Sequence, residues 1–522
     1  MSPWLPWTDE VFAVAKAEGR PLLAATGAQP PESLGAVGEI ISRLFVAVLV
    51  DAETRPDAAL RIGRECAVVL DSEGFRRAVL PLPACDVGAA LERLAGEASS
   101  GVQGRPEPEE PAWTGAVCVK PAIASSALSL TEAFEAVRAA GEAESPPVAV
   151  LQALLYASSE RGDLKAGNLL AGALNRLQEN LPGKVGQRAC GPEGSSPLLS
   201  HACLARLFWD AHALTGDAQW RETAVLSSTF LLRDLYDPGM GAFRRAKGSS
   251  ESPAVGNARA VLALLRAAAF GVPGASEASG KTLAFLQNRL YDPSRGLVRS
   301  SNAAGGQRFG LLADSAWVAL AFAEASSATG LKAHREFADV LMKSLFQELW
   351  ERESGGFLDR VPLEGDPPIL RELHLDAGLN AVAFEACWRL HHLKGNANYR
   401  RWLDWGLRGV WPVAGLDPSG LAGLARAADM AARGRLALEL VGRVGDPRAG
   451  ALLSAALRHS SPRAVISFVD PDDQDYILAH KLTAGSYPRL FGCGADLRRL
   501  ADTDDPARVG DVIAAVRASE GV

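Results

Sequence analysis

Apolar and polar positions alternate in a repeated two-helix pattern between about residues 125 and 430. In each unit a polar residue opens an apolar helix, a second helix follows, and a glycine-containing turn closes the unit. Four units open at His201, Asn257, Asp314 and Asn380, at intervals of roughly 60 residues. One helical hairpin cannot bury its apolar face alone, so the pattern predicts a stack of hairpins.

Two kinds of helix alternate within this region. The segment 316–323, AWVALAFA, is apolar on every side, whereas 335–350, REFADVLMKSLFQELW, has a single apolar face. An earlier hairpin is expected over 148–181 and a further helix over 418–434. A fully buried inner helix followed by a one-faced outer helix predicts an (α/α)6 toroid, and an open superhelical solenoid is the alternative.

Shorter apolar runs flank the helical region. In residues 1–98 helical patterns alternate with short strands such as 45–51, FVAVLVD, which indicates a small α/β domain. A stretch rich in Pro, Gly and Glu makes 99–124 a linker. Residues 125–434 then form the toroid and 435–522 a small C-terminal α/β lobe. The predicted fold is therefore multidomain and mainly α.

Composition narrows the functional classes. The net charge of −7 without a basic stripe argues against a nucleic-acid partner, and no apolar run is long enough to span a membrane. Acidic residues stand at Asp9 and Glu10, where a signal peptide would be basic. The seven cysteines form neither a CxxC pair nor a zinc-finger spacing. We therefore expect reduced thiols, a cytoplasmic location, and no metal or cofactor.

Two strings carry a resemblance to a known family. The segments PWTDEVFAVAKAEGRPLLAATG and FVAVLVDAETRPD resemble the N-terminal domain of the spermatogenesis-associated, bacterial YyaL-type protein family. This resemblance implies a thioredoxin-like domain fused to a ring similar to the N-acylglucosamine 2-epimerase and six-hairpin glycosidase barrels. The family carries a Cys-His-Trp-Cys-His signature between the two strings, but here the segment AQPPESLGAVGEIISRLF has no Cys and no His. Dithiol chemistry needs two thiols in reach of each other, so we expect no redox activity.

In a toroid the four opening residues would gather round one central cavity. Polar residues at the start of buried helices ordinarily act as helix caps, and convergence on a cavity makes ligand contact an alternative. The candidate catalytic residues are His374, Glu372, Asp314 and His201, because general acid–base chemistry and glycoside hydrolysis both need paired titratable groups. The candidate ligand-binding residues are Arg308, Asn257, Asn380, Asp376 and Trp317. Solvated loops, caps and core packing are the competing interpretations of these positions.

The family's polar string His-Phe-Glu-Lys-Met-Leu-Tyr-Asp-Asn is replaced here by GSSPLLSHACLA, although Leu312, Asp314, Ala316 and Asn380 match. Two hypotheses follow. The first is a catalytically eroded member that acts by binding, as a scaffold or regulatory partner. The alternative is a carbohydrate-active enzyme, a sugar isomerase, epimerase or glycosidase, that uses the toroid cavity. The expected partner is a small carbohydrate or another protein.

Overall fold

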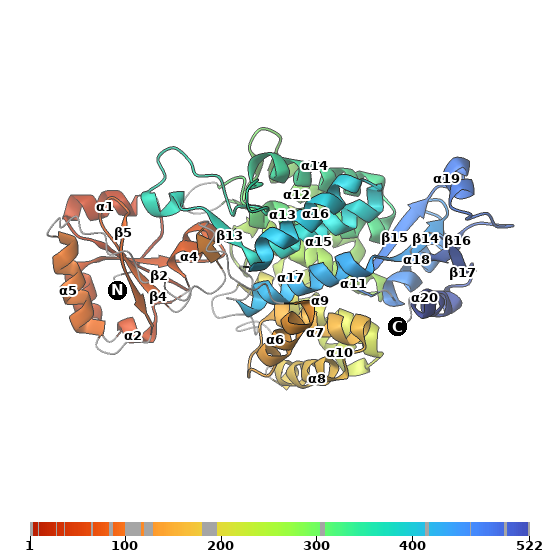
Figure 1. Ribbon diagram of the computed structural model, residues 1–522, viewed down its shortest axis with the longest axis horizontal. Helices are drawn as coiled ribbons and strands as arrows, with labels where there is room; N and C mark the ends of the chain where they lie inside the picture. The colour runs from red at the N-terminus through yellow and green to blue at the C-terminus, as the bar shows by residue number, and fades with distance from the viewer. Residues whose placement is uncertain are drawn as a thin grey trace.

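The computed structural model describes residues 4–8, 10–27, 29–35, 37–63, 66–82, 87–99, 116–118, 129–179, 196–302, 308–412, 417–459, 461–494 and 498–519. Within these ranges the chain forms three units that follow one another along the long axis of the molecule (Figure 1): an N-terminal α/β unit, a central set of helices, and a C-terminal α/β lobe. No helix in these ranges combines the length and the apolar character that crossing a membrane requires.

The N-terminal unit is built on a five-stranded sheet in the order β1-β3-β2-β4-β5. Strands β1, β3 and β2 run parallel, and β4 and β5 are added antiparallel. The strand bounds are β1 Trp4–Pro6, β2 Leu22–Thr26, β3 Val46–Val50, β4 Cys66–Leu70 and β5 Arg76–Pro81. The central strands are buried on both faces, which explains their nearly unbroken apolar runs.

Helices pack on both sides of this sheet. They are α1 Val11–Glu18, α2 Glu32–Gly35, α3 Gly38–Leu44, α4 Pro56–Ile62 and α5 Val87–Ser99. The predicted α/β character of this unit is thus observed, and its thioredoxin-like classification stays a prediction. Most of the predicted linker lies outside the described residues. Its described part includes strand β6 (Ala116–Cys118), which pairs antiparallel with β13 (His374–Asp376).

Six helices form the inner wall of a closed ring. Each packs against the next in the order α7, α9, α11, α13, α15, α17, and α17 packs back against α7. The bounds are α7 Val148–Arg161, α9 Pro197–Thr215, α11 Ala254–Ala269, α13 Leu312–Thr329, α15 Ala377–Lys394 and α17 Pro418–Arg433. This closure confirms the predicted toroid and excludes the open solenoid.

Each inner helix has an outer partner. Five outer helices follow their inner helix in the chain: α8 Leu164–Glu179, α10 Ala218–Phe230, α12 Ala275–Arg289, α14 Lys332–Glu348 and α16 Ala397–Val410. The sixth, α6 (Leu130–Gly141), precedes the ring and packs on α17, the last inner helix. The sixth hairpin is therefore assembled from the two ends of the ring, which explains why the sequence repeat shows it only as separate helices.

Short strands and turns link three of the outer helices, α10, α12 and α14, to the following inner helix. They are the π-helical turn η1 Leu231–Leu235, β7 Tyr236–Asp237, β8 Ala242–Phe243, β9 Ser252–Pro253, β10 Tyr291–Asp292, β11 Gly296–Leu297, β12 Ser300–Ser301 and the 3-10 turn η2 Pro368–Arg371. All of them lie between the end of an outer helix and the start of an inner one, so they gather at the mouth of the ring.

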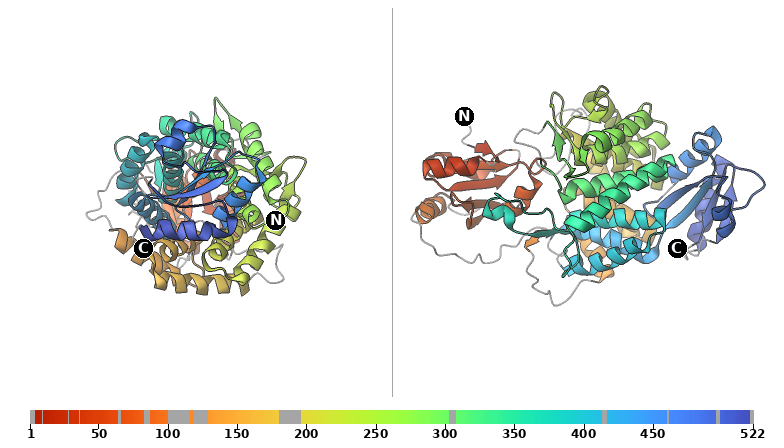
Figure 2. Two further views of the ribbon diagram at one scale, coloured as in Figure 1. Left: turned by 90° about the vertical axis from the view of Figure 1, so that its right-hand side faces the viewer. Right: turned by 90° about the horizontal axis from the view of Figure 1, so that it is seen from above.

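The C-terminal lobe has a four-stranded sheet in the order β15-β14-β16-β17. Its elements are β14 Leu436–Val441, α18 Pro447–His459, β15 Ala464–Val469, α19 Gln474–Ala479, β16 Arg489–Cys493, β17 Arg499–Thr503, η4 Pro506–Arg508 and α20 Val509–Ser519. Helix α18 packs on inner helices α9, α11 and α13, and Arg458 donates to the carbonyl of Ala269 at the end of α11. The lobe thus covers the end of the ring opposite the mouth, as Figure 2 shows along and across the long axis.

Candidate functional site

The mouth of the ring is covered by the N-terminal α/β unit. The segment 51–57, called the 51–57 loop below, runs from the end of strand β3 into the first turn of α4 and reaches into the mouth. Glu53 accepts a hydrogen bond from the backbone N–H of Ser196, the N-cap residue of inner helix α9, at 2.5 Å. The backbone carbonyl of Glu53 accepts from Arg299 Nε at 2.7 Å. This loop has the sequence DAETRPD, the end of the second string that carries the family resemblance.

The charges of this loop are paired with arginines of the ring. Arg245 forms ion pairs with Asp51 and, at 3.2 Å, with Glu53. Arg360 reaches Asp57 Oδ2 at 2.9 Å, and Arg55 donates to both oxygens of the same carboxylate at 3.0 Å. Burial acts to raise the pKa of Asp57, but the two guanidinium groups outweigh it and lower the pKa to about 2. The Asp57 carboxylate is therefore held ionised at the junction.

Asp314 is the most perturbed carboxyl group at the mouth. It is fully buried near the start of α13, and its Oδ1 accepts from Arg299 at 2.5 Å. Its Oδ2 has no hydrogen-bond partner among the described residues. Burial raises the pKa of Asp314 to about 6, with Arg299 opposing the rise and Asp57 adding to it. A carboxyl group that titrates near neutrality is suited to proton transfer, but Arg299 lies between it and the nearest cavity wall.

Glu372 and His374 lie together on the segment that leads into α15. His374 Nε2 is 3.6 Å from Glu372 Oε2, which is longer than a hydrogen bond. Glu372 also pairs with Arg76 of the N-terminal unit at 2.8 Å, and its carbonyl accepts from Arg61. Burial raises the pKa of Glu372, whereas His374, Arg76 and Arg61 lower it, and the net shift is downward. Two of the candidate catalytic residues thus lie close together, on the face that the N-terminal unit covers.

Asn257 and Asn380 fulfil one and the same structural role in two repeats. Asn257 accepts from the backbone N–H of Phe243 at 2.7 Å and donates to the carbonyl of the same residue at 3.0 Å. Asn380 makes the same pair of bonds to Phe357, at 2.7 and 2.9 Å. Each amide therefore ties the turn of the preceding hairpin to the next inner helix.

His201 packs against an outer helix. Its ring is buried and stacks on Phe230 of outer helix α10, with 4.0 Å between ring centroids. Burial lowers the pKa of His201 to about 4, so the ring is neutral at neutral pH. Within the described part of the chain, no hydrogen bond, ion pair or ring contact joins His201 to Glu372 or His374.

The expectation that the four opening residues cap their helices is corrected by the structure. The N-cap positions are occupied by Ser196, Pro253, Leu311 and Asp376. The opening residues therefore lie inside the helices, between three and five residues after the N-caps. Asp376 itself caps α15, because its Oδ1 accepts from Leu379 N–H at 2.6 Å.

Trp317 lies on inner helix α13 and is half-buried. The guanidinium of Arg259 stands 3.9 Å from the centre of its ring, and Arg259 also contacts Cys203 Sγ at 2.6 Å. These residues come from the neighbouring inner helices α9 and α11, so one face of Trp317 is already covered by a cation.

A cavity of about 210 Å³ lies between the 51–57 loop and the ring mouth. Its wall includes Trp7 and Asp51 from the N-terminal unit and Arg245, Arg299 and Arg308 from the ring. Of the candidate catalytic and ligand-binding residues, Arg308 alone is on this wall. Sequence reasoning missed Arg245 and Arg299, since nothing in their local sequence distinguishes them from the other arginines of the chain. The acidic loop that meets them was visible only through the family resemblance.

Among the described residues, no group of three or more His, Cys, Asp and Glu side chains is placed to hold a metal ion. Cys203 and Cys387 are free, buried thiols on two of the inner helices. Burial raises the pKa of the Cys387 thiol well above its usual range, which disfavours the reactive thiolate.

No protein-family model matches the sequence, and no curated protein is similar to it. Solved structures with a similar course of the chain include a family 105 glycoside hydrolase from C. acetobutylicum ATCC 824, with a TM-score of 0.47, 10% identity, and coverage of 58% of this chain and 99% of that one. An unsaturated glucuronyl hydrolase from Bacillus sp. GL1 has a TM-score of 0.46 and 12% identity, with coverage of 58% of this chain and 96% of that one. A D-mannose isomerase has a TM-score of 0.43 and 11% identity, with coverage of 56% of this chain and 88% of that one. Because these TM-scores are below 0.5, the likenesses do not indicate a function for this chain.

Proposed function

We propose that this chain binds a small neutral carbohydrate in the cavity between the 51–57 loop and the ring mouth, and that it acts through this binding. The observation that carries the proposal is the composition of the cavity wall. Trp7, Asp51, Glu251 and several arginines share one cavity at the junction of two structural units, a common place for ligand sites.

The wall offers both kinds of hydrogen-bonding group. The carboxylates of Asp51 and Glu251 only accept hydrogen bonds, whereas the guanidinium groups of Arg245 and Arg299 only donate them. A sugar hydroxyl both donates and accepts, so a polyhydroxylated ligand can satisfy both sets. Arg245 is already paired with Asp51 and Glu251 of the wall, and Arg299 with Asp314 behind the wall, which favours a neutral ligand over an ionic one.

Trp7 adds an unused donor. Its indole is only 5% exposed, and Nε1 has no hydrogen-bond partner among the described residues. A buried N–H without a partner costs about 1–3 kcal/mol, and a ligand hydroxyl that accepted from it would recover part of that cost. The volume of about 210 Å³ lies below the roughly 300–1,000 Å³ of sites for larger ligands, which points to a ligand of one or two sugar rings.

Sugar turnover is the second candidate function, and Asp314 favours it. Its pKa of about 6 and its unpartnered Oδ2 are the properties of a general acid, and it contacts Arg299, which lines the cavity. Turnover requires Arg299 to move aside so that a ligand meets Asp314. Binding alone requires no such movement, which is why we place it first.

Thermal unfolding against a panel of neutral and acidic mono- and disaccharides tests both candidates. We expect a saturable rise in Tm with a neutral sugar, reduced in Trp7→Phe, which removes the N–H and keeps an aromatic ring. Trp405→Phe, on outer helix α16 and 39% exposed, is the matched control and should respond as the wild type does. No stabilisation by any sugar would contradict the proposal.

The same sugar is then incubated with the protein in deuterated water and followed by NMR. Deuterium incorporation, epimerisation or hydrolysis that is lost in Asp314→Asn would establish the enzyme. Binding without any change in the sugar supports the first candidate.

A further inference from the structure

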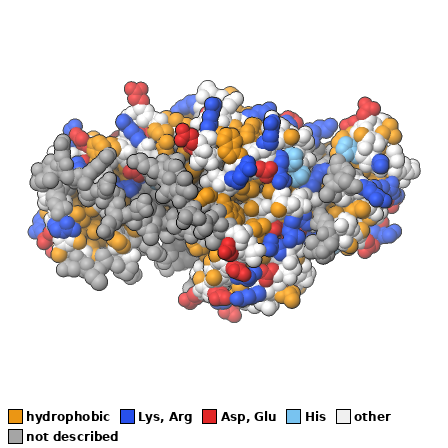
Figure 3. Space-filling model, in the orientation of Figure 1, with side chains coloured by type: hydrophobic (Ala, Val, Ile, Leu, Met, Phe, Trp, Pro, Cys, Tyr) orange, Lys and Arg blue, Asp and Glu red, His pale blue; other side chains and the backbone are white. Residues whose placement is uncertain are grey.

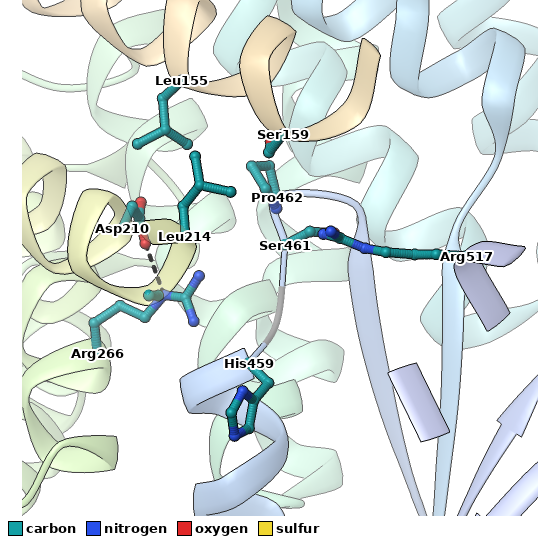
Figure 4. A pocket seen from close by; sticks show the side chains of 10 residues that line it. Leu155, Ser159, Asp210, Leu214, Arg266, His459, Ser461, Pro462 and Arg517 are labelled. Atoms are coloured by element: carbon teal, nitrogen blue, oxygen red, sulfur yellow. Dashed lines mark hydrogen bonds and ion pairs between the residues drawn. The ribbon is translucent and has the colours of Figure 1, made fainter. Parts of the chain in front are cut away.

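A second cavity lies at the opposite end of the ring, where the C-terminal lobe meets the inner helices (Figure 4). Its volume is about 60 Å³. A single water needs roughly 10–15 Å³ on this scale, so the cavity has room for a few waters or for one small polyatomic ion. It is far smaller than the cavity at the mouth and has a different lining.

Cationic groups approach this cavity from both sides. Arg266 extends from inner helix α11 and Arg517 from helix α20 of the lobe, and Figure 4 shows their guanidinium groups directed toward the space between them. Arg517 meets Glu160 at 3.4 Å, and its buried Nε has no hydrogen-bond partner among the described residues. The cavity therefore contains donor capacity that the protein itself does not use.

Ser461 supplies an uncharged donor at the same place. It is 7% exposed and lines the cavity, and its buried Oγ has no hydrogen-bond partner among the described residues. A buried hydroxyl left without a partner is costly, so its position beside two arginines indicates that something else occupies the space. His459, exposed at the edge of the cavity, marks its side toward solvent.

The surrounding network carries more positive than negative charge. Ion pairs link the inner helices to one another and to the lobe, and the acidic members already have guanidinium partners. The ion pairs form two sets: one joins Arg206, Arg266, Arg389 and Arg426 with Asp210, Glu324 and Glu385, and the other joins Arg463 and Arg517 with Glu160. Each set contains one more arginine than carboxylate, so an anion is favoured in the cavity between them.

Asp210 is the one carboxylate on the cavity wall, and it does not oppose an anion strongly. Its Oδ2 accepts from Arg206 at 2.6 Å and its Oδ1 from Arg266 at 2.8 Å, so both oxygens are neutralised. Burial and the nearby Arg206 lower the pKa of Arg266. A bound anion would raise that pKa again, because it stabilises the charged guanidinium.

We propose that this cavity binds a free tetrahedral oxyanion, inorganic phosphate or sulfate, between Arg266, Arg517 and Ser461. The ion would join the ring to the lobe, because it takes donors from both. The proposal is independent of the carbohydrate site at the mouth.

Calorimetric titration of the full chain with inorganic phosphate and with sulfate, at constant ionic strength set by sodium chloride, tests the site. We expect one equivalent to bind and a saturable rise in Tm. Arg517→Gln should weaken binding by roughly tenfold or more, because a charge-assisted hydrogen bond is lost. Ser461→Ala should weaken it by a smaller factor.

Arg508→Gln is the matched control, since Arg508 lies in the same lobe with a side chain 70% exposed. It should bind as the wild type does. Absence of saturable binding, or equal binding by Arg517→Gln with an unchanged circular dichroism spectrum, would overturn the proposal. A phosphate monoester such as a sugar phosphate that bound more tightly than inorganic phosphate would overturn the assignment to a free oxyanion.

Discussion

Arg61 and Asp359 lie 298 positions apart in the sequence and meet at 2.8 Å across the junction between the N-terminal unit and the ring. Their side chains are 0% and 3% exposed. A buried ion pair contributes little net stability compared with apolar residues, but it fixes how two surfaces dock, because any other arrangement leaves a charge buried and unpaired. The N-terminal unit is thereby held over the ring mouth in one position.

Arg61→Gln is expected to destabilise the docked state by about 3–5 kcal/mol, since it leaves Asp359 buried without its partner. Chemical denaturation would measure the change, and limited proteolysis would show earlier release of the N-terminal unit. Arg43→Gln breaks the exposed pair with Glu92 and should cost less than about 1 kcal/mol. Equal losses in the two variants would show that the buried pair does not fix the docking.

Asn380→Asp is expected to lower the free energy of unfolding by about 2–4 kcal/mol, which denaturant titration would measure. The substitution removes the donors to the carbonyls of Phe357 and Asp376 and places a charge in a buried site. Asn257→Asp should behave in the same way because its bonds to Phe243 are equivalent. The exposed Asn175→Asp, which keeps its acceptor for Gln219, is the control.

The carboxyl group of Asp314 should make the protein less stable as pH rises from about 4 to 6. Its pKa is raised from 3.8 to about 6 on folding, so in this window the folded state binds the proton that the unfolded state has released. The shift corresponds to about 3 kcal/mol, and Asp314→Asn should lack this part of the pH dependence. Urea denaturation at several pH values measures it, with the exposed Asp475→Asn as control.

His201 should have the opposite effect in the same window. Burial lowers its pKa from 6.5 to about 4, so stability is lost as pH falls from about 6.5 toward 4, while the unfolded state takes up a proton that the folded state rejects. His201→Leu should remove a loss of about 3 kcal/mol, whereas the exposed His459→Leu should leave it in place. An unchanged pH profile in His201→Leu would mean that this ring is protonated without cost.

The chain is not expected to reduce insulin disulfides at a rate above that of free thiol. The segment between the two family strings has no cysteine to act as nucleophile or as resolving thiol. Turbidity after addition of dithiothreitol and the protein, compared with dithiothreitol alone, measures this. Acceleration by the protein would contradict the prediction.

Several parts of the architecture followed from local pattern alone. Helix α13 is apolar on every side because it is enclosed by neighbours, and its follower α14 has one apolar face because the other meets solvent. The pattern of apolar residues in each segment shows this difference, so the sequence alone distinguishes inner from outer helices. The absence of a dithiol motif was equally plain from the sequence.

The assembly of the candidate site depended on contacts between distant segments. Local periodicity says which face of an element is buried, but not which element covers it. Asp51 and Asp57 form ion pairs with Arg245 and Arg360 because the N-terminal unit packs over the ring. Helix α6 completes the sixth hairpin because it packs on α17. Ion pairing and ring closure are properties of the folded chain as a whole, so only the tertiary structure decided which polar residues form the cavity and which, like Asn257, hold the fold together.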